Sequence, residues 1–301
     1  MCAGTSNQNQ KMTDKNNANL STVLNLKSEY NLRFASFNCR SVKNSVDELK
    51  SLCVNHDVIC LQEHWLLPFD LDYLNCIDSN FTSFGSFAID VEAGVLNGRP
   101  YGGTAILFRR SLSACVNRVK CNNHRITAIT IGMSINGSAF PVLLASVYMP
   151  VNDPTVQSDD EFEFVCGSLN ALIEDCNVLG YILCGDFNFN IDSPRHKYIC
   201  NSLTSKEAML ADEMLLAKHS FTYVSDCHST VSWLDHVIVN RYLFSKISNF
   251  NILYGTVSSD HRPVSFVLNA NVVLNNSSKM SETVVHDWMA SNQDDLNNFS
   301  N

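Results

Sequence analysis

Hydrophobic residues recur along this chain with two different periods, and the two periods predict different elements. Apolar residues at helical spacing predict helices over 41–55, 161–177 and 205–218. Alternating or continuous apolar runs predict strands at 32–38, 57–61, 102–108, 125–135, 139–148, 181–188, 233–239 and 263–268. The pair Asn136-Gly137 between two of these runs is a hairpin signal. The first strand, helix and second strand form a β-α-β unit, in which the two strands are parallel.

Polar side chains stand where several predicted strands end. Asn38 closes the first strand and Glu63 follows the second, so we expect the parallel pair to align these two residues. An apolar run also ends in Gly-Asp186-Phe-Asn188, and residues two apart in a strand share a face. The same four residues are also typical of an ordinary Asx turn. Strand ends are where α/β folds place their chemistry, so these residues are candidates for a functional site.

The candidate residues carry oxygen ligands rather than sulfur or many imidazoles. Mg²⁺ needs only one or two carboxylates, so Glu63, helped by Asn38, forms a natural ligand pair that substrate phosphate completes. Zinc would require more histidine and cysteine ligands.

The remaining candidates suit proton transfer. Asp186 and Asn188 can align and deprotonate an attacking water molecule. His261 can stabilise developing negative charge if a carboxylate holds its other ring nitrogen, and Asp235 is the candidate for that carboxylate.

Composition sets the domain organisation. With 301 residues and 45% apolar content, the chain can bury the core of one large domain, which we place at 30–270. Residues 1–29 form a polar leader without a signal or membrane segment, and 271–301 form a polar tail or truncated linker. Twelve cysteines without a CxxC pair indicate reduced thiols and an intracellular location, in the nucleus or cytoplasm.

Charge is distributed unevenly along the chain. A net charge of -9 excludes nucleic-acid binding over the whole surface. Residues 93–152 nevertheless contain no acidic residue and include Arg99, Arg109, Arg110, Arg118, Lys120 and Arg125. This segment is either a surface that follows phosphates or a set of solvated strand ends, and Arg109 and Arg110 are weak phosphate-binding candidates.

Several motifs together resemble a known superfamily, that of the endonucleases, exonucleases and phosphatases. In chain order they are Phe37-Asn38, Gln62-Glu63, Tyr148-x-Pro150, Gly185-Asp186-Phe187-Asn188, Leu234-Asp235 and Ser259-Asp260-His261. Three stretches resemble more specifically the apurinic-type endonuclease domain of non-LTR retrotransposons: Asn38-Cys39-Arg40-Ser41, Val46-Asp47-Glu48-Leu49 and Ser232-Trp233-Leu234-Asp235-His236. The resemblance covers residues 31–270.

The resemblance implies an α/β fold, a four-layer sandwich of two packed mixed β-sheets with helices on the outer faces. It also implies a hydrolase that uses Mg²⁺, with Mn²⁺ as an alternative, to nick DNA and leave a 3′ hydroxyl. By position it implies the following roles: Asn38, Glu63 and Asp260 on the metal side, Tyr148 on the phosphate, Asp186 and Asn188 on the water, and Asp235 with His261 as a charge-stabilising dyad.

Two departures from the family pattern bear on function. Arg40 stands where apurinic repair enzymes tend to carry an acidic residue, which argues against a repair role and makes Arg40 a weak DNA-binding candidate. The segment after Tyr148 is one residue longer than the usual Tyr-x-Pro-Asn, so Asn152 is also only a weak candidate.

Two other functions stay open, a phosphatase or phosphodiesterase of the same fold acting on a small or lipid phosphate, and a catalytically silent remnant or binding module. For partners we expect DNA, no membrane and no obligate protein, in a monomer whose ancestor was linked to a reverse transcriptase. We also expect four histidines on the surface or in loops: His64, His124, His196 and His228.

Overall fold

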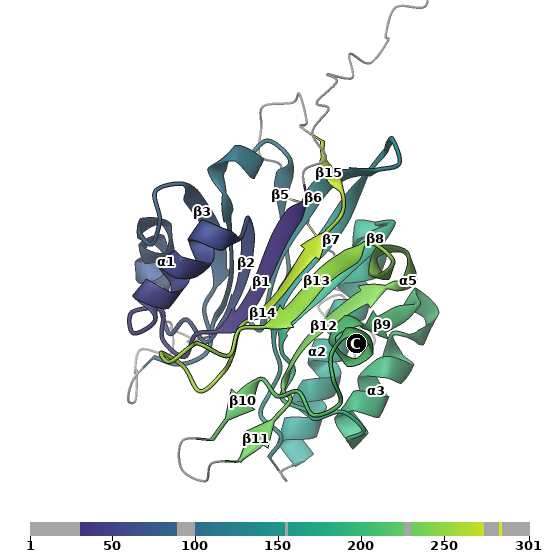
Figure 1. Cartoon of the computed structure of the whole chain (residues 1–301). Helices are drawn as coiled ribbons and strands as arrows, with labels where there is room; N and C mark the ends of the chain where they lie inside the picture. The colour runs from purple at the N-terminus through teal and green to yellow at the C-terminus, as the bar shows by residue number, and fades with distance from the viewer. Residues whose placement is uncertain (1–30, 89–99, 154–155, 226–229, 274–282, 285–301) are drawn as a thin grey trace, which may run out of the picture.

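Two β-sheets pack face to face and helices cover their outer faces, which confirms the α/β sandwich (Figure 1). The computed structural model describes residues 31–88, 100–153, 156–225, 230–273 and 283–284. The predicted leader at 1–29 lies outside the described residues, as do Arg99, His228 and nearly all of the predicted tail. Within the described part, no helix is both long enough and apolar enough to cross a membrane.

The first sheet has six strands in the order β13-β14-β1-β2-β4-β3. Their bounds are β1 Leu32–Asn38, β2 Val58–Gln62, β3 Phe81–Ser86, β4 Thr104–Arg109, β13 Ile247–Ile252 and β14 Val264–Leu268. As predicted, β1 and β2 are parallel, but Asn38 pairs with Gln62 rather than with Glu63. The predicted alignment was wrong by one residue because β2 continues through Gln62.

The second sheet has the order β16-β5-β6-β7-β8-β12-β9, with β15 paired to β6. Its strands are β5 Val116–Lys120, β6 Ile126–Ile135, β7 Ser138–Tyr148, β8 Gly180–Asp186, β9 Ala208–Leu210, β12 Asp235–Asn240, β15 Asn271–Val272 and β16 Thr283–Val284. The predicted hairpin joins β6 to β7, and both Asn136 and Gly137 have positive φ, as its turn requires. β7 and β8 are parallel and end side by side at Tyr148 and Asp186. A separate small hairpin joins β10 Tyr223–Val224 to β11 Val231–Ser232.

Helices lie on the two outer faces, with α1 on one side and α2 and α3 on the other (Figure 1). The α-helices are α1 Val46–Asn55, α2 Val156–Cys176, α3 Pro194–Ser202, α4 Ala211–Leu215 and α5 Arg241–Phe244, and the 3-10 turns are η1 Pro68–Cys76, η2 Arg110–Leu112 and η3 Thr204–Lys206. The buried stripe of α1 contains Leu49, Leu52 and Cys53, as its spacing predicted. Residues 41–45 precede this helix as a turn.

The predicted helix at 205–218 is wrong. Glu207 has a positive φ of 54°, which ends any helix, and residues 208–210 form β9, which pairs with β12 at the edge of the second sheet. A short helix, α4, follows. The neighbouring helix α3 was not predicted, although Pro194 occupies its first turn and the Ser193 side chain caps it.

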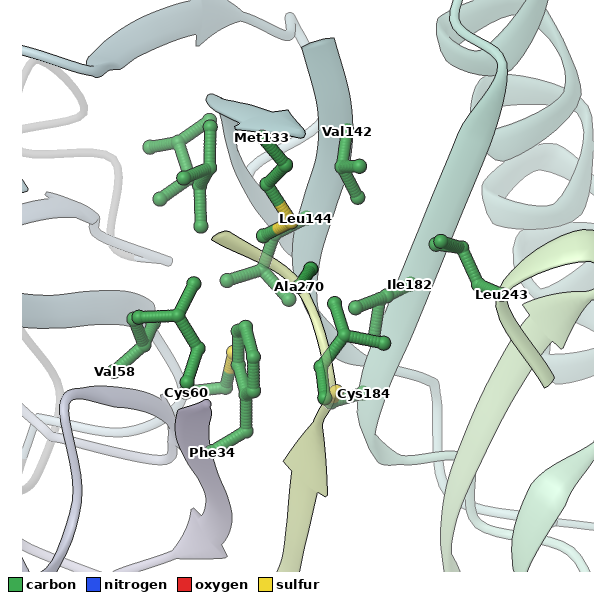
Figure 2. Packing of buried hydrophobic residues seen from close by; sticks show 14 of the residues in the cluster. Phe34, Val58, Cys60, Met133, Val142, Leu144, Ile182, Cys184, Leu243 and Ala270 are labelled. Atoms are coloured by element: carbon green, nitrogen blue, oxygen red, sulfur yellow. The ribbon is translucent and has the colours of Figure 1, made fainter. Parts of the chain in front are cut away.

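Among the described residues the apolar core forms three clusters, one between the two sheets (Figure 2) and two that include buried residues of α2 and α1. Phe34 and Phe266 from adjacent strands stack with ring centroids 5.1 Å apart. Cys60 of the first sheet and Cys184 of the second are both buried in this core. All ten described cysteines are free thiols, which agrees with the predicted reduced state.

Candidate functional site

One amide group joins the two sheets at the strand ends. Asn38, the last residue of β1, is fully buried and uses Nδ2 to donate to Glu63 Oε1 at 3.0 Å. The same nitrogen donates to Asp186 Oδ2 at 2.9 Å, although Asp186 belongs to the other sheet. The sandwich therefore brings two of the predicted carboxylates to either side of one side chain.

Glu63 follows β2 and has a positive φ of 53°. Its Oε2 accepts a hydrogen bond from Trp65 Nε1 at 3.0 Å. Burial raises the pKa of Tyr148 well above its usual value, and the Glu63 and Asp186 carboxylates add to the rise, so the phenol keeps its proton at neutral pH.

His261 lies between two carboxylates. Its Nδ1 is 2.7 Å from Asp235 Oδ2, and its Nε2 is 3.8 Å from Asp186 Oδ2. Burial lowers the pKa of His261, but the attraction of Asp235 and then of Asp186 outweighs burial and raises it to about 10. The raised pKa favours the imidazolium form, in which Nδ1–H donates to Asp235 and Nε2–H faces Asp186.

Asp186 ends β8 and is buried. Burial raises the pKa of Asp186, the Asp235 and Glu63 carboxylates raise it further, His261 opposes them, and the result is about 7. Its Oδ1 accepts a hydrogen bond from the backbone N of Asn188 at 3.0 Å, so the Asx-turn interpretation is also correct.

Asn188 lies beyond the strand, with a φ of 51°, so the prediction that it shares a strand face with Asp186 is wrong. The Asx turn redirects the chain before this residue. Asn188 Nδ2 donates instead to the Met149 carbonyl oxygen at 2.8 Å, which connects the loop after β8 to the residue after β7.

Asp260 and Arg40 form an ion pair in which Arg40 Nη1 is 2.5 Å from Asp260 Oδ2. The neighbouring Ser259 hydroxyl donates to the Asn38 carbonyl oxygen at 2.8 Å. These contacts bring the loop before β14 to the end of β1. Arg40 already neutralises Asp260, so Glu63 is the more available carboxylate for a metal ion.

The structure does not bring three weak candidates to this site. Arg109 lies at the opposite end of β4, where its Nε bonds Asp57 at 2.8 Å, and Arg110 donates to the Ser79 carbonyl oxygen. Asn152 is exposed and lines a separate pocket of about 260 Å³ beside Arg195 and other residues of α2 and α3.

The histidine predictions were partly wrong. His196 is buried in α3, so its prediction is wrong. His64 lies in the loop after β2, as predicted, but is buried there, and His124 is exposed as expected. His64 is held by two backbone groups, since Nδ1 accepts from Leu66 N and Nε2 donates to the Ser86 carbonyl oxygen, both at 3.0 Å.

The donor set fits a hard divalent cation. Three carboxylates converge here, and repulsion among them contributes to the raised pKa of Asp186, a repulsion that a cation would relieve. Beside Asn38, burial raises the pKa of the Cys39 thiol far above its usual value, so no thiolate is offered to a soft metal.

Two groups of residues are candidate metal ligands here, Glu63 with Asn38 and the trio of Asp186, Asp235 and His261. The Asp186, Asp235 and His261 ligand atoms lie within 4.8 Å of one another. In this group His261 Nδ1 already lies 2.7 Å from Asp235 Oδ2, so the ring and this carboxylate are paired with each other. Glu63, oriented by Asn38, remains the best-placed ligand, and the contribution of Trp65 to its orientation was not anticipated from the sequence.

Comparisons with known proteins agree with this fold. The profile of the Endonuclease/Exonuclease/phosphatase family matches residues 35–261. A search of curated proteins finds no match.

Several solved structures have a similar fold. The APE2 catalytic domain of Xenopus laevis is 16% identical, with a TM-score of 0.67 over 82% of this chain and 94% of that one. The AP endonuclease LMAP of Leishmania major is 13% identical, with a TM-score of 0.65 over 79% and 88%. A 3′ phosphatase from Neisseria, NExo, bound to a product DNA hairpin, is 15% identical, with a TM-score of 0.60 over 79% and 99%. At these identities the likeness concerns the fold.

Proposed function

The chain belongs to the endonuclease/exonuclease/phosphatase family, and from that premise we propose that it is a Mg²⁺-dependent DNA endonuclease of the retrotransposon type. It nicks a phosphodiester bond and leaves a 3′ hydroxyl. The observation that carries the proposal is the continuous polar network from Glu63 through Asn38, Asp186 and His261 to Asp235, which spans both sheets.

Glu63 and Asn38 are the residues that would hold the metal ion. Mg²⁺ held there would neutralise charge on the phosphate and polarise it toward attack. The Asn38 amide nitrogen lies between the Glu63 and Asp186 carboxylates and donates a hydrogen bond to each, which fixes the position of both.

Asp186 is the proposed general base. Its pKa of about 7 is close to physiological pH, where a base is most effective. Asp186 takes a proton from water, whose oxygen attacks phosphorus, and the bond from phosphorus to O3′ breaks. The 3′ oxygen then takes a proton from solvent. Asn188 shapes this site through its Asx turn with Asp186.

His261 and Tyr148 are the proposed donors to the phosphate oxygens. The imidazolium of His261 keeps its charge because Asp235 holds Nδ1, which leaves Nε2–H for the site. The Tyr148 phenol keeps its proton, so it also donates rather than repelling the substrate.

DNA is the proposed substrate for two reasons. Two similar structures are described as AP endonuclease or APE2 domains, and a third contains product DNA. Arg40 fits the retrotransposon branch rather than repair, and its pairing with Asp260 places that cation at the end of β1, next to the site.

A plasmid assay tests the proposal. We expect the full chain with Mg²⁺ to convert supercoiled plasmid to the nicked form, and Asp186→Ala to lower the rate by about 10² to 10⁴. Glu174→Gln is a matched control, since this carboxylate pairs with Lys206 on the surface. Equal nicking by wild type and Asp186→Ala would refute the assignment.

A phosphatase of the same fold is the second candidate, because NExo is described as a 3′ phosphatase. Release of phosphate from a 3′-phosphorylated oligonucleotide or a soluble inositol polyphosphate, without plasmid nicking, would favour it. No turnover of any of these substrates would favour a silent module.

A further inference from the structure

The carboxylate of Glu63 is held at both oxygens by donors from different elements. Asn38 Nδ2 donates to Oε1 and Trp65 Nε1 donates to Oε2, each at 3.0 Å. A carboxylate oxygen has two lone pairs, so each oxygen can accept one of these bonds and still face a cation. Two fixed donors in this arrangement restrict rotation of the carboxylate plane.

The backbone conformation of residues 63–65 allows the Trp65 indole to reach the Glu63 carboxylate. Glu63 and Trp65 both have positive φ, 53° and 57°, a conformation that costs energy for residues other than glycine. Trp65 N donates to the Gly102 carbonyl oxygen at 3.1 Å, which fixes the second of these positions.

The residue between them locks the turn. The buried His64 ring bonds to two backbone groups and lies against Gly103, where any Cβ would overlap the ring. The turn is therefore held in its strained form by its surroundings, as is common at functional sites. In this conformation of the turn, Trp65 Nε1 donates a hydrogen bond to Glu63 Oε2.

We propose that Trp65 is a positioning residue for the Mg²⁺-binding carboxylate and that its indole reports occupancy of the site. The inference rests on the proposed function, since it takes Glu63 as the metal ligand. Trp65 acts through Glu63 and not on the substrate. Losing a partner that orients a metal ligand typically lowers metal affinity 10- to 100-fold.

Calorimetric titration of the full chain with MgCl₂ measures this effect. We expect Trp65→Phe, which keeps an aromatic ring but removes the N–H, to weaken Mg²⁺ binding about 10-fold. Trp233→Phe is the matched control, because the buried Nε1 of Trp233 has no hydrogen-bond partner among the described residues. Thermal melts of both variants check that they fold.

A fluorescence measurement does not depend on the folding of Trp65→Phe. The chain has three tryptophans, so the double substitution Trp233→Phe and Trp288→Phe leaves Trp65 as the sole indole. We expect MgCl₂ to change its emission with the same Kd as in calorimetry. Adding Glu63→Gln should abolish the change.

The outcomes separate the two proposals. Unchanged Mg²⁺ affinity in Trp65→Phe, or a silent Trp65 while calorimetry detects binding, overturns the role of Trp65 and leaves the nuclease assignment standing if the plasmid is nicked. A wild-type protein that neither binds Mg²⁺ nor nicks DNA overturns both.

Discussion

At the scale of single residues, Asp235 determines the charge of His261. Asp235→Asn removes the carboxylate that most strongly raises the pKa of His261, while burial, which lowers that pKa, remains. We expect the imidazole to lose its charge at neutral pH and the nicking rate to fall by about 10². Plasmid nicking by Asp235→Asn measures the rate, and the histidine ring signals in NMR measure the charge. A variant with wild-type nicking and a still-charged ring would contradict this dependence.

Residue identities could be predicted where a polar group ends an apolar run, as Asp186 and Asn38 do. Side-chain direction was harder to predict. Asn188 was assigned a strand face because period-two spacing assumes that the strand continues, whereas the Asx turn redirects the chain after Asp186. Trp65 was missed because its contact with Glu63 depends on positive φ at both residues, and no pattern in the neighbouring sequence predicts these φ values.

At the scale of elements, the parallel pairing of β7 with β8 depends on Gly185. A Cβ at this position would overlap the Val147 carbonyl on β7. We therefore expect Gly185→Ala to push the two strands apart, lower stability by about 3 kcal/mol and displace the adjacent Asp186 enough to abolish nicking.

A second glycine provides the control for this substitution. Gly167 lies within α2 and has open space around its Cβ position, so Gly167→Ala should stabilise the chain by up to about 1 kcal/mol and leave nicking unchanged. Urea unfolding of both variants measures the stabilities. If the two substitutions changed stability equally, the close contact between Gly185 and Val147 would not explain why glycine precedes Asp186.

An ion network around the buried Asp57 joins three strands of the first sheet at the end away from the site. Asp57, before β2, accepts hydrogen bonds from Arg33 of β1 and Arg109 of β4. Burial alone would raise the pKa of Asp57, but the hydrogen bonds from the Arg33 side chain, the Arg33 backbone N–H and the Arg109 side chain outweigh it, and the pKa is lowered.

The sign of the resulting pH dependence follows from this lowered pKa. The unfolded chain has the ordinary value near 3.9, so the stabilisation is present above about pH 4 and is lost as pH falls through the lower folded-state pKa. We expect Asp57→Asn to cost about 2 kcal/mol at pH 7 and to flatten the loss of stability as the pH falls below about 4. Thermal melts across this range test it, with the exposed Asp175→Asn as a control that keeps the wild-type slope.

Long elements with strong periodicity could be predicted from the sequence, and β1, β6 and β7 lie within a residue of their expected bounds. Short edge elements could not. The stretch Ala208–Leu210 contains only three residues, so its pairing with β12, a tertiary contact, decides its conformation. β13 was missed for a related reason, since polar residues interrupt its apolar pattern.

At the scale of the whole molecule, the site exists only because the two sheets pack together. Asn38 and Asp186 are 148 residues apart and belong to different sheets. No local periodicity could place them in contact, and only the order of the motifs, through a family resemblance, indicated their proximity. The basic segment was equally hard to place from the sequence. Arg109 and Thr104 lie at opposite ends of β4, and the Arg109 guanidinium pairs with Asp57.

Because the carboxylates come from both sheets, metal binding should stabilise the whole sandwich. A cation at Glu63 reduces repulsion with Asp186, and any ligand that binds only the folded state raises its stability. At Mg²⁺ concentrations ten times Kd, the gain is about 1.4 kcal/mol, which corresponds to a rise in Tm of roughly 3–6 °C for a domain of this size. EDTA should reverse it.

Differential scanning calorimetry with and without Mg²⁺ measures this stabilisation, and two glutamate variants locate its origin. Glu63→Gln should remove the Mg²⁺-dependent rise in Tm, because it removes the carboxylate that we propose as the metal ligand. Glu174→Gln should keep the rise, since Glu174 pairs with Lys206 on the outer surface. If the rise survived in Glu63→Gln, the ion would bind elsewhere, and the Asp186, Asp235 and His261 group would become the metal site in its place.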